Sequence, residues 1–589
     1  MSTRLLLLLL LVNAAIAWQK CKTLPGDPSF PSPDTWASFA KNLSQPLVSN
    51  QLPLGAPCHK TSPAYDPQAC AAVTAQQFSH TFLAASPNGI QWTNYMELVA
   101  NDTVQQCVFD PQPDATCYQG RVPSYSINVS TVADVQHTIR FATTHNLHLV
   151  VKNNGHENLG RMFGYGSVEL FMHNLQDYTF TDSFVPEGAP SGTAGQTVTI
   201  DSGVQWGTLY SLASQNNRTV AGGIGAGGTV GAGAGWPLGG GHSILSPYYG
   251  LGVDNVLQFS VVLPNASFVV TNQYQYPDLF WALRGGGGPN FGVVLKTTFR
   301  THPNPPYTAA FYAATASSNS SYFQLLETFN KHHNSIADSG WAGFWPFQDQ
   351  TLYLTLIAQG APTFNTTANS TLQSFISDSA AIPGVNITLN KQIVYSDFED
   401  WYYNNFINST NGFGFNYTVG DAGGLRITVS SWLIPRDVFD NNATALAEAW
   451  MGIPASLLIC CHSLVGGGAV AQGDPDSAAV TPAWRTTISD MTIANAWAEN
   501  ATVAEIQAIK QGVYDQIQPL RALAPVPLGG QYINEPDDLE VDWQGAYWGR
   551  HYPRLLALKK IIDPNDLFIV YKGVNSESWD ANVVCKTLP

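Results

Sequence analysis

Charged residues are scarce in this sequence, and basic residues are the scarcer kind. Only 12% of its 589 residues are charged, with 26 Lys and Arg against 42 Asp and Glu, and the formal net charge is −16. Proteins that bind nucleic acid neutralise phosphates with a stripe or patch of Lys and Arg, which this sequence does not have. We therefore expect no nucleic-acid partner, and we favour a neutral or hydrophobic small molecule as the substrate.

Long hydrophobic runs are missing after the first few residues. Residues 5–12 form an apolar run that follows Arg4 and precedes the small-residue pattern Ala15-Ile16-Ala17, a combination typical of a secretory signal peptide. Residues 1–17 are the predicted signal peptide, with cleavage before Trp18. No later run is long enough to span a bilayer. We expect a secreted, extracellular protein with no membrane-spanning segment.

Cys-x-x-Cys pairs are also missing, and with them the usual spacing of zinc ligands, so no metal site is expected. In an exported chain, the eight cysteines indicate disulfides instead. Cys21 and Cys585 each open the pentapeptide CKTLP, and we expect them to pair; the pairing of the other cysteines is left open.

Sequons of the Asn-x-Ser/Thr type predict N-linked glycans. They begin at Asn42, Asn101, Asn128, Asn217, Asn265, Asn319, Asn365, Asn369, Asn386, Asn408, Asn416, Asn442 and Asn500. We also expect the protein to be a monomer.

Changes in the character of the sequence divide the mature chain into four parts. Residues 18–121 are rich in Pro, Cys and polar residues, which predicts a small N-terminal lobe tied by disulfides. Residues 122–302 combine a capped amphipathic helix with strand patterns and glycine clusters. Residues 303–525 have the patterns of a second, α/β domain. Residues 526–589 include a strong helical pattern at 552–562, and we expect the chain to return there to the first domain.

The segment VVKNNGHENLGR, residues 150–161, places His156 in a polar loop directly after a predicted strand. Gly155 and Gly160 flank this histidine. A core histidine would lie on an apolar face, a zinc ligand would need partners at ligand spacing, and a catalytic base is a further alternative. The residues alone leave a structural and a functional role equally open.

Glycine is concentrated in TVAGGIGAGGTVGAGAGWPLGGGHS, residues 219–243, and again in RGGGGPNFGVV, residues 284–294. A linker is one alternative, but Val230 and Trp236 would be costly to expose in a linker. Residues 223–228 fit G-x-G-x-x-G, yet that dinucleotide fingerprint requires a following helix, which the sequence does not predict. Glycine lets backbone amides approach a bound anion closely. Two such loops suggest a large, extended ligand that carries phosphates.

These segments, together with PSYSINVSTVADVQHTIRFA before them and YWGRHYPRLLALKKIIDPNDLF near the end, resemble a known family. They are similar to the secreted flavoprotein oxidases of the vanillyl-alcohol oxidase and p-cresol methylhydroxylase superfamily, in their berberine-bridge-enzyme-like branch. The resemblance covers essentially the mature chain. It implies an α+β fold, in which a two-part FAD-binding domain of the p-cresol-methylhydroxylase type is interrupted by an α/β substrate domain with a large antiparallel sheet. It also implies FAD as the cofactor.

In such proteins the histidine of a Gly-His-Asp motif bonds covalently to the flavin, and here residues 155–157 are Gly-His-Glu, which keeps the carboxylate. Many relatives carry a second link through a cysteine just before Thr-Val-Gly. No cysteine precedes Thr229 in this way, and none lies between Cys117 and Cys460. The resemblance therefore implies FAD attached through His156 only. Val230 matches the position that controls oxygen access in relatives, which implies dioxygen as the electron acceptor.

The same resemblance extends the expected cofactor contacts to the neighbours of these motifs. Besides His156, the expected cofactor-binding residues are Asn153, Asn154, Gly155, Glu157, Gly160, Thr229, Val230, Gly231, Gly235, Gly239, Gly240, Gly241, His242, Asn255, Gly292, Val293 and Val294. For His242 the residues themselves favour a structural hydrogen bond that supports the glycine run.

The C-terminal motif departs from the family pattern. Gly-x-Asn-Tyr is usual, whereas residues 549–552 are Gly-Arg-His-Tyr, so a histidine adds a group that titrates at about pH 6.5. Oxidation of an alcohol also requires a base that removes the hydroxyl proton, and no motif identifies it. The catalytic candidates are Tyr552, His551 and Tyr532, with Asn534, Tyr402 and Tyr403 as alternatives.

The leading hypothesis is a secreted FAD-dependent oxidase. Its substrate alcohol, a carbohydrate or an aromatic or secondary-metabolite compound, would transfer a hydride to flavin N5, and dioxygen would then be reduced to hydrogen peroxide. One alternative is an oxidative cyclase or dehydrogenase of secondary metabolism that uses the same flavin. The other alternative is a non-catalytic secreted glycoprotein that binds flavin or carbohydrate.

Overall fold

The computed structural model describes residues 21–112, 114–190, 195–360, 366–408, 423–454 and 462–587. The expected signal peptide, the sequons at Asn365 and Asn416, and Cys460 lie outside these ranges. No helix within them is both long enough and apolar enough to cross a membrane.

The strand that precedes His156 belongs to a small sheet with the order β1-β4-β6-β5, in which β6 is parallel to both β4 and β5. Helix α5 (Val132–Thr144) connects β4 to β5 and begins with a capping box between Thr131 and Asp134. Its residues Val135 and Ile139 are buried in the same core as Leu149. The predicted helix and strand are thus confirmed. The strands are β1 (Val48–Ser49), β4 (Tyr125–Asn128), β5 (Leu149–Lys152) and β6 (Val168–Phe171).

The connections between strands of a second sheet, which has five antiparallel strands, carry both glycine-rich segments. Its order is β10-β9-β11-β8-β7. The strands are β7 (Tyr178–Phe184), β8 (Gly195–Asp201), β9 (Val256–Val262), β10 (Phe268–Thr271) and β11 (Val293–Arg300), and the helices between them are α6 (Trp206–Gln215), α7 (Ser246–Tyr249), α8 (Gly252–Asn255) and α9 (Pro277–Leu283).

A third sheet confirms the large antiparallel sheet that was expected in the middle of the chain. Its order is β16-β12-β15-β13-β18-β19-β17, with β14 beside β15. Its strands are β12 (Tyr307–Ala316), β13 (Ala342–Phe344), β14 (Phe347–Gln348), β15 (Thr351–Gln359), β16 (Val385–Tyr395), β17 (Ile427–Pro435), β18 (Ser463–Leu464) and β19 (Thr487–Ala496).

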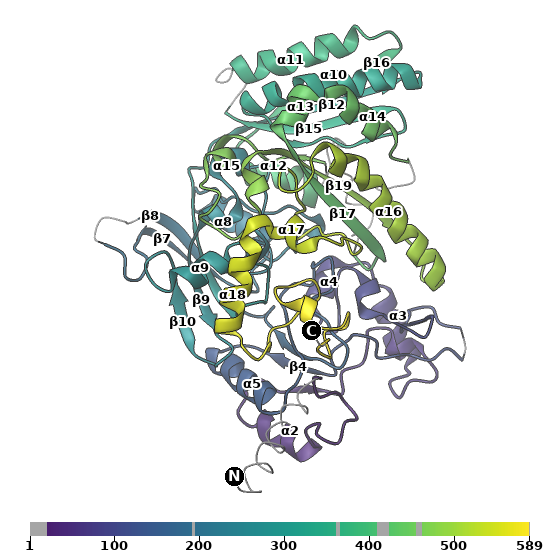
Figure 1. Ribbon diagram of the computed structural model, residues 1–589, viewed down its shortest axis with the longest axis vertical. Helices are drawn as coiled ribbons and strands as arrows, with labels where there is room; N and C mark the ends of the chain where they lie inside the picture. The colour runs from purple at the N-terminus through teal and green to yellow at the C-terminus, as the bar shows by residue number, and fades with distance from the viewer. Residues whose placement is uncertain are drawn as a thin grey trace, which may run out of the picture.

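Helices cover this large sheet at the top of the molecule in Figure 1, where α10, α11, α13 and α14 gather, while α16 runs beside β17 and β19. These helices are α10 (Asn319–Asp338), α11 (Thr366–Ala380), α12 (Phe398–Tyr402), α13 (Arg436–Asn441), α14 (Ala443–Met451), α15 (Gly468–Gln472) and α16 (Val503–Leu523). One continuous hydrophobic core joins the second and third sheets. It contains Trp206, Trp236, Trp345, Trp432 and Trp484.

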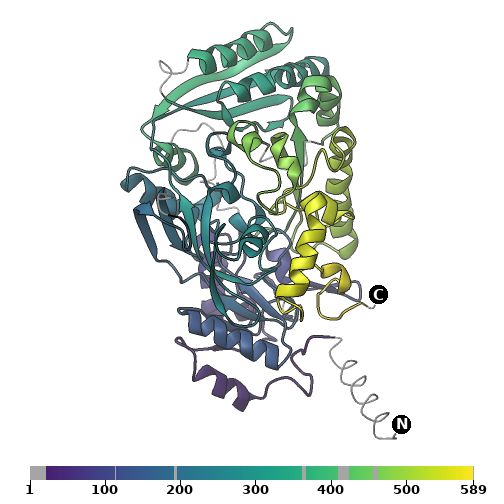
Figure 2. The same cartoon turned by 60° about the vertical axis from the view of Figure 1, so that its left-hand side comes forward.

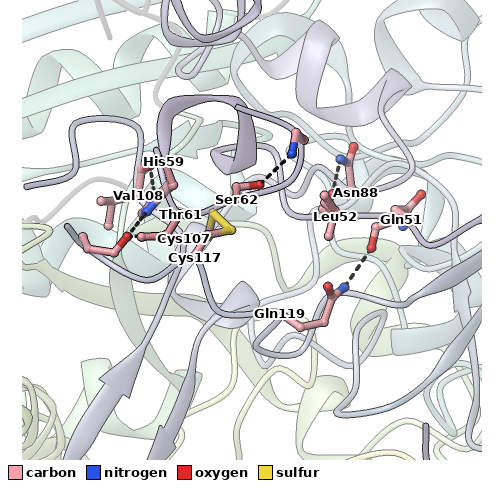
Figure 3. Close-up of a disulfide and its surroundings, with 12 residues drawn as sticks. Gln51, Leu52, His59, Thr61, Ser62, Asn88, Cys107, Val108, Cys117 and Gln119 are labelled. Carbon is pink, nitrogen blue, oxygen red and sulfur yellow. Dashed lines mark hydrogen bonds between the residues drawn. A yellow bond between two sulfur atoms is a disulfide. The ribbon is translucent and has the colours of Figure 1, made fainter. Parts of the chain in front are cut away.

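Two short-range disulfides tie the N-terminal segment, Cys58–Cys70 and Cys107–Cys117. Around the second of them the chain is held by side-chain hydrogen bonds, such as Gln119 Nε2 to the carbonyl of Gln51 at 3.0 Å (Figure 3). The segment contains α2 (Pro33–Ala40), α3 (Pro67–Thr74), α4 (His80–Ala85) and a hairpin of β2 (Leu98–Ala100) and β3 (Thr103–Gln105). Regular structure is sparse here, so disulfides and side-chain contacts replace sheet hydrogen bonds.

The two ends of the described chain are joined by the disulfide Cys21–Cys585, as the repeated pentapeptide predicted. The C-terminal helices α17 (Trp543–Trp548) and α18 (Tyr552–Ile562) are yellow in Figures 1 and 2, and α18 packs against α9. Lys559 Nζ donates to the carbonyl of Asn290 at 2.7 Å, directly before β11. The C-terminal segment therefore lies against the second sheet, far from its neighbours in sequence.

Candidate functional site

The loop that follows β5 folds around the carboxylate of Glu157. This carboxylate accepts hydrogen bonds from the backbone N–H of Leu159 at 3.0 Å and of Arg161 at 2.6 Å, and it also pairs with the guanidinium of Arg161. Gly160 has a φ of +65°, and a Cβ there would lie 2.4 Å from the side chain of Tyr95. The loop conformation thus depends on a glycine and an internal ion pair, and it presents His156 on its other side.

His156 is brought to the glycine-rich segment by a direct side-chain contact. Its Nε2 lies 2.7 Å from Oγ1 of Thr229, which is buried. The ring of His80 lies parallel to the His156 ring, with 5.6 Å between centroids. Burial, with a smaller contribution from His80, holds the pKa of His156 well below its ordinary value. The imidazole is therefore neutral at physiological pH, as a nucleophile or ligand requires.

Asn154, two residues before His156, positions this loop rather than facing a ligand freely. Its Oδ1 accepts from Nδ1 of His173 at 2.5 Å and from Nε2 of Gln205 at 3.3 Å, while its Nδ2 donates to the carbonyl of Gly203 at 3.1 Å. These bonds join the first sheet to the start of α6. Asn154 was predicted to bind the cofactor, and its side chain makes hydrogen bonds that position the loop. The predicted attachment of the cofactor concerns His156.

Several predicted cofactor glycines serve protein packing. A Cβ at Gly239 would lie 1.9 Å from Oδ1 of Asn534, one at Gly240 would lie 2.8 Å from Val480, and one at Gly241 would meet the ring of Trp236 at 2.7 Å. Close approach of side chains, and not only of an anion, explains the density of glycine here. Gly235 is different, because its φ is +77° and nothing lies within 4 Å of a Cβ built there.

Asn255 lies at the end of α8, and residues 292–294 lie at the start of β11. Nδ2 of Asn255 donates to the carbonyls of Tyr249 and Leu251, and its Oδ1 lies 2.7 Å from Nε2 of His302. Val293 and Val294 pair with β9. Among the described contacts, none joins these residues to His156, and their contact with FAD stays a prediction.

A second group of polar side chains surrounds His242. Its Nε2 lies 3.4 Å from Oε1 of Glu535 and 3.7 Å from Oδ2 of Asp490, and its ring lies 4.7 Å from that of Tyr532. Thr492 Oγ1 donates to the other carboxylate oxygen of Glu535 at 2.6 Å. We call His242, Asp490, Tyr532 and Glu535 the proton cluster.

Burial and neighbouring charges shift the pKa values of two members of the proton cluster, Asp490 and His242. Asp490 is fully buried in β19, and neither of its oxygens has a hydrogen-bond partner among the described residues. Burial and the negative charge of Glu535 raise its pKa, partly offset by His242. Burial alone would lower the pKa of His242, but Glu535 and Asp490 raise it. The cluster therefore holds its protons more tightly than isolated carboxylates would.

A hydrogen-bond path connects the proton cluster to the His156 loop. Asn158, two residues after His156, donates through Nδ2 to the carbonyl of Asn534 at 2.6 Å. Nδ2 of Asn534 in turn donates to the hydroxyl of Tyr532 at 2.6 Å. Tyr532, a catalytic candidate from the sequence, is thus the member of the proton cluster that this path connects to the His156 loop.

The other two catalytic candidates are held elsewhere. The hydroxyl of Tyr552 donates to the carboxylate of Glu577 at 2.6 Å, and its ring stacks on Trp548. His551 is fixed by the carbonyl of Val480 at 2.9 Å and the carboxylate of Asp476 at 2.9 Å. The described contacts do not bring either residue to His156 or to Asp490. Both nitrogens of His551 are occupied, so this histidine supports the chain around Val480.

The residues present fit a flavin dinucleotide between the loop and the glycine-rich segment. Asn158 Oδ1, Arg161 Nη1 and Ser202 Oγ are buried without a hydrogen-bond partner among the described residues, so they are free to meet polar groups of a ligand. The open space at Gly235 lies in the same glycine-rich segment as Thr229, residues 219–243. FAD offers both donors and acceptors along its length, and His156 would be the residue that holds it.

Sequence reasoning missed His80, Asp490 and Glu535. An isolated acid within a buried strand was a usable signal for Asp490, because a carboxylate is costly to bury without a function or a partner. For His80 the local sequence carries no signal, since only the fold places α4 beside the loop after β5.

Comparisons with known proteins show to which family the chain belongs. The family model described as FAD binding domain matches residues 123–272, and the one described as berberine and berberine like matches residues 531–575. An uncharacterized FAD-linked oxidoreductase of Arthroderma benhamiae is 34% identical, over 99% of this chain and 99% of its own. The crystal structure of a vanillyl-alcohol-oxidase-type flavoprotein, MtVAO615 from Myceliophthora thermophila C1, superposes with a TM-score of 0.84 at 28% identity, covering 96% of this chain and all of that one.

A more distant structure shares the fold. The glucooligosaccharide oxidase of Acremonium strictum, whose FAD is described as 6-S-cysteinyl and 8α-N1-histidyl, has a TM-score of 0.62 at 20% identity, over 77% of this chain and 91% of its own. Its likeness supports the architecture of the three sheets. Taken with the full-length relative and the two family models, it leads to one conclusion. The chain belongs to the FAD-linked oxidoreductases of the vanillyl-alcohol oxidase superfamily, with a berberine-like C-terminal region.

Proposed function

We propose that this protein is a secreted oxidase that converts a hydroxyl group of a small organic molecule to a carbonyl, with FAD bonded covalently to His156 and dioxygen as the electron acceptor. The observation that carries the proposal is the placement of a neutral His156 against Thr229, one short hydrogen-bond path from the proton cluster. When bound, FAD supplies hydride acceptance and, with dioxygen, the formation of hydrogen peroxide.

The attachment atom that we assign is Nδ1 of His156. Nε2 is engaged by Oγ1 of Thr229 at 2.7 Å, and if Nε2–H donates to this hydroxyl, the tautomer leaves Nδ1 unprotonated. An unprotonated imidazole nitrogen is the form that can bond to carbon. Thr229 occupies the place next to which a second, cysteinyl link would form, and no cysteine lies between Cys117 and Cys460. A single histidyl link follows.

The proton cluster would receive the substrate hydroxyl proton. Asp490 is the acceptor that we assign, because its carboxylate oxygens are buried and have no hydrogen-bond partner among the described residues. His242 lies beside it, with Nε2 at 3.7 Å from Asp490 Oδ2 and at 3.4 Å from Glu535 Oε1. Burial and Glu535 raise the pKa of Tyr532, so its phenol keeps its proton and can orient a substrate oxygen.

The division of the chain follows from its contacts. We infer that residues 122–302 and 526–589 form one FAD-binding domain and that residues 303–525 form the substrate domain. The sheet that contains β12 to β19 lies wholly within the second range, and the Lys559 to Asn290 bond ties the C-terminal part to the first. Three disulfides support an oxidising, extracellular location.

The test of this function uses protein purified from culture medium. The flavin should stay with the acid-precipitated protein, and a His156→Ala variant should release it, whereas His145→Ala, a change on the surface at the end of α5, should not. Peroxide release should then appear with at least one member of a panel of oligosaccharides and aromatic alcohols. A colourless precipitate of the unaltered protein would refute covalent attachment. Substrate turnover that reduces an added dye but releases no peroxide would instead indicate a dehydrogenase.

A further inference from the structure

The N-terminal lobe contacts the flavin-attachment loop, although it lies outside the matched FAD-binding region. Gln91 donates through its backbone N–H to the carbonyl of Gly155 at 3.0 Å, and its Nε2 donates to the carbonyl of His80 at 3.1 Å and to that of Asn154 at 3.4 Å. Gln91 is fully buried. One side chain therefore holds helix α4 and the His156 loop together.

A buried lysine makes a second connection between the same two segments. Lys152, at the end of β5, donates through Nζ to the carbonyls of Leu83 and Ser86, at the end of α4. Its exposed fraction is 0%. The position of α4 against the loop is thus fixed on both sides of His156.

Helix α4 uses this position to place His80 over His156. The two rings are parallel within 6°, their centroids lie 5.6 Å apart, and His80 is 2% exposed. Parallel rings restrict rotation of the His156 imidazole about its side-chain bonds. A proton on either ring would also be repelled by a proton on the other.

The charged groups around His156 leave His80 as the one that acts on its protonation. Glu157 is turned to the backbone and guanidinium of Arg161, and Lys152 is turned to the carbonyls of α4. Thr229, on the glycine-rich segment, is uncharged. Burial comes first among the influences that lower the pKa of His156, and His80 is the second.

We propose that His80 is a positioning residue for covalent attachment of FAD, because its ring lies parallel to the His156 imidazole and orients it. This inference rests on the histidyl attachment proposed above. It makes the N-terminal lobe a working part of the flavin site, since without α4 the loop would present a histidine free to rotate and to take up a proton.

The experiment follows the rate of attachment itself. Apoprotein from a riboflavin-auxotrophic host is incubated with FAD, samples are stopped with acid, and flavin in the protein precipitate is measured over time at about pH 5.5 and pH 8. His80→Ala should attach FAD roughly tenfold more slowly, or worse, at both pH values, because orientation is lost. His80→Phe keeps a parallel ring, so its rate should stay close to that of the unaltered protein at the higher pH and fall at the lower one.

Phe82→Ala is the matched control, because Phe82 lies on the same helix and packs against the N-terminal core, and no described contact joins it to His156. It should lower the melting temperature and leave the attachment rate unchanged. Attachment in His80→Ala at the rate of the unaltered protein, or an equal slowing in Phe82→Ala, would overturn the inference. Absence of acid-stable flavin in the unaltered protein would refute the proposed attachment instead, so the two failures are distinguishable.

Discussion

At the scale of single residues, Asp490 carries the sharpest consequence. Its carboxyl group lies in a buried strand with no hydrogen-bond partner among the described residues, beside His242 and Glu535. A buried acid with a raised pKa is neutral at low pH and becomes a base only when the pH passes its pKa. With Asp490 as the proton acceptor proposed above, the same ionisation would serve catalysis and oppose folding.

Turnover should therefore rise with pH through the raised pKa of Asp490. Asp490→Asn removes the acceptor, and kcat should fall by roughly 10² to 10⁴ at all pH values, with the pH-dependent rise lost. Stopped-flow measurement of flavin reduction between about pH 5 and pH 9 tests this, since it reports the substrate step alone. Thr199→Val, a change in a hydroxyl pair between β8 and β11, is a control that should keep the profile. A preserved rise in Asp490→Asn would assign the acceptor elsewhere.

Stability should change in the opposite direction over the same pH range. A carboxyl group whose pKa is higher in the folded state than in the unfolded state stabilises the fold at low pH, and this contribution is lost as the pH rises through the folded-state pKa. Asp490 has such a raised pKa, and burial also raises the pKa of Glu169 to about 7. The melting temperature of the unaltered protein should fall as turnover rises. In Asp490→Asn the fall should be shallower; an identical slope would contradict the burial argument.

The proton cluster also has the composition of a metal site, since one ligand atom each from His242, Asp490 and Glu535 lies within 4.8 Å of the others. Thr492 already donates to Glu535, and Glu535 already faces His242, which fits proton exchange without an ion. Dialysis against EDTA should leave turnover and flavin content unchanged. Loss of turnover that added Zn²⁺ restores would show that the group is a metal centre.

At the scale of elements, the short helix η4 (Pro237–Gly239) places the glycine-rich segment against Asn534. A Cβ at Gly239 would lie 1.9 Å from Oδ1 of Asn534, whose amide links Trp236 to Tyr532. Gly239→Ala should displace Asn534 and lower kcat by about tenfold or more through misplacement of Tyr532. Gly512→Ala is the control, because nothing lies within 4 Å of a Cβ there. In the middle of α16 it should stabilise the protein by about 0.5–1 kcal/mol and keep kcat. Equal effects on kcat would refute the steric argument.

Local pattern predicted the elements well and the site only in part. The capping box at Thr131 and the apolar spacing of α5 are interactions between near neighbours, so the sequence displays them directly. The same holds for α18, whose observed bounds are Tyr552–Ile562. The proton cluster joins His242 in residues 122–302 to Asp490 in β19 and Glu535 near the C-terminus. Such long-range proximity comes from packing, which is why the sequence motifs pointed to Tyr552, whose hydroxyl donates to Glu577, and not to Asp490.

At the scale of the whole molecule, the disulfide Cys21–Cys585 closes almost the entire chain into one loop. Its sequence separation is 564, against 12 for Cys58–Cys70. A cross-link restricts the unfolded chain more when the loop is longer, and the chain-entropy relation gives a difference of about 3 kcal/mol between these two bonds. Beside it, Lys22 Nζ donates to the carbonyl of Asp566 at 2.9 Å, so the N-terminal strand is also held by the C-terminal segment that packs on α9 and β11.

Replacement of Cys21 and Cys585 by serine should therefore lower the melting temperature more than replacement of Cys58 and Cys70. The first pair of changes affects the C-terminal segment that carries Asn534 and Glu535, so FAD should also be released from a His156→Ala background at a lower temperature. The second pair affects a local loop of the N-terminal lobe. Thermal melts followed by flavin fluorescence and by tryptophan fluorescence, in the presence and absence of a reductant, separate the two effects. Equal falls in melting temperature would show that loop length does not govern the contribution of this bond, and that the contacts of Lys22 hold the termini together without it.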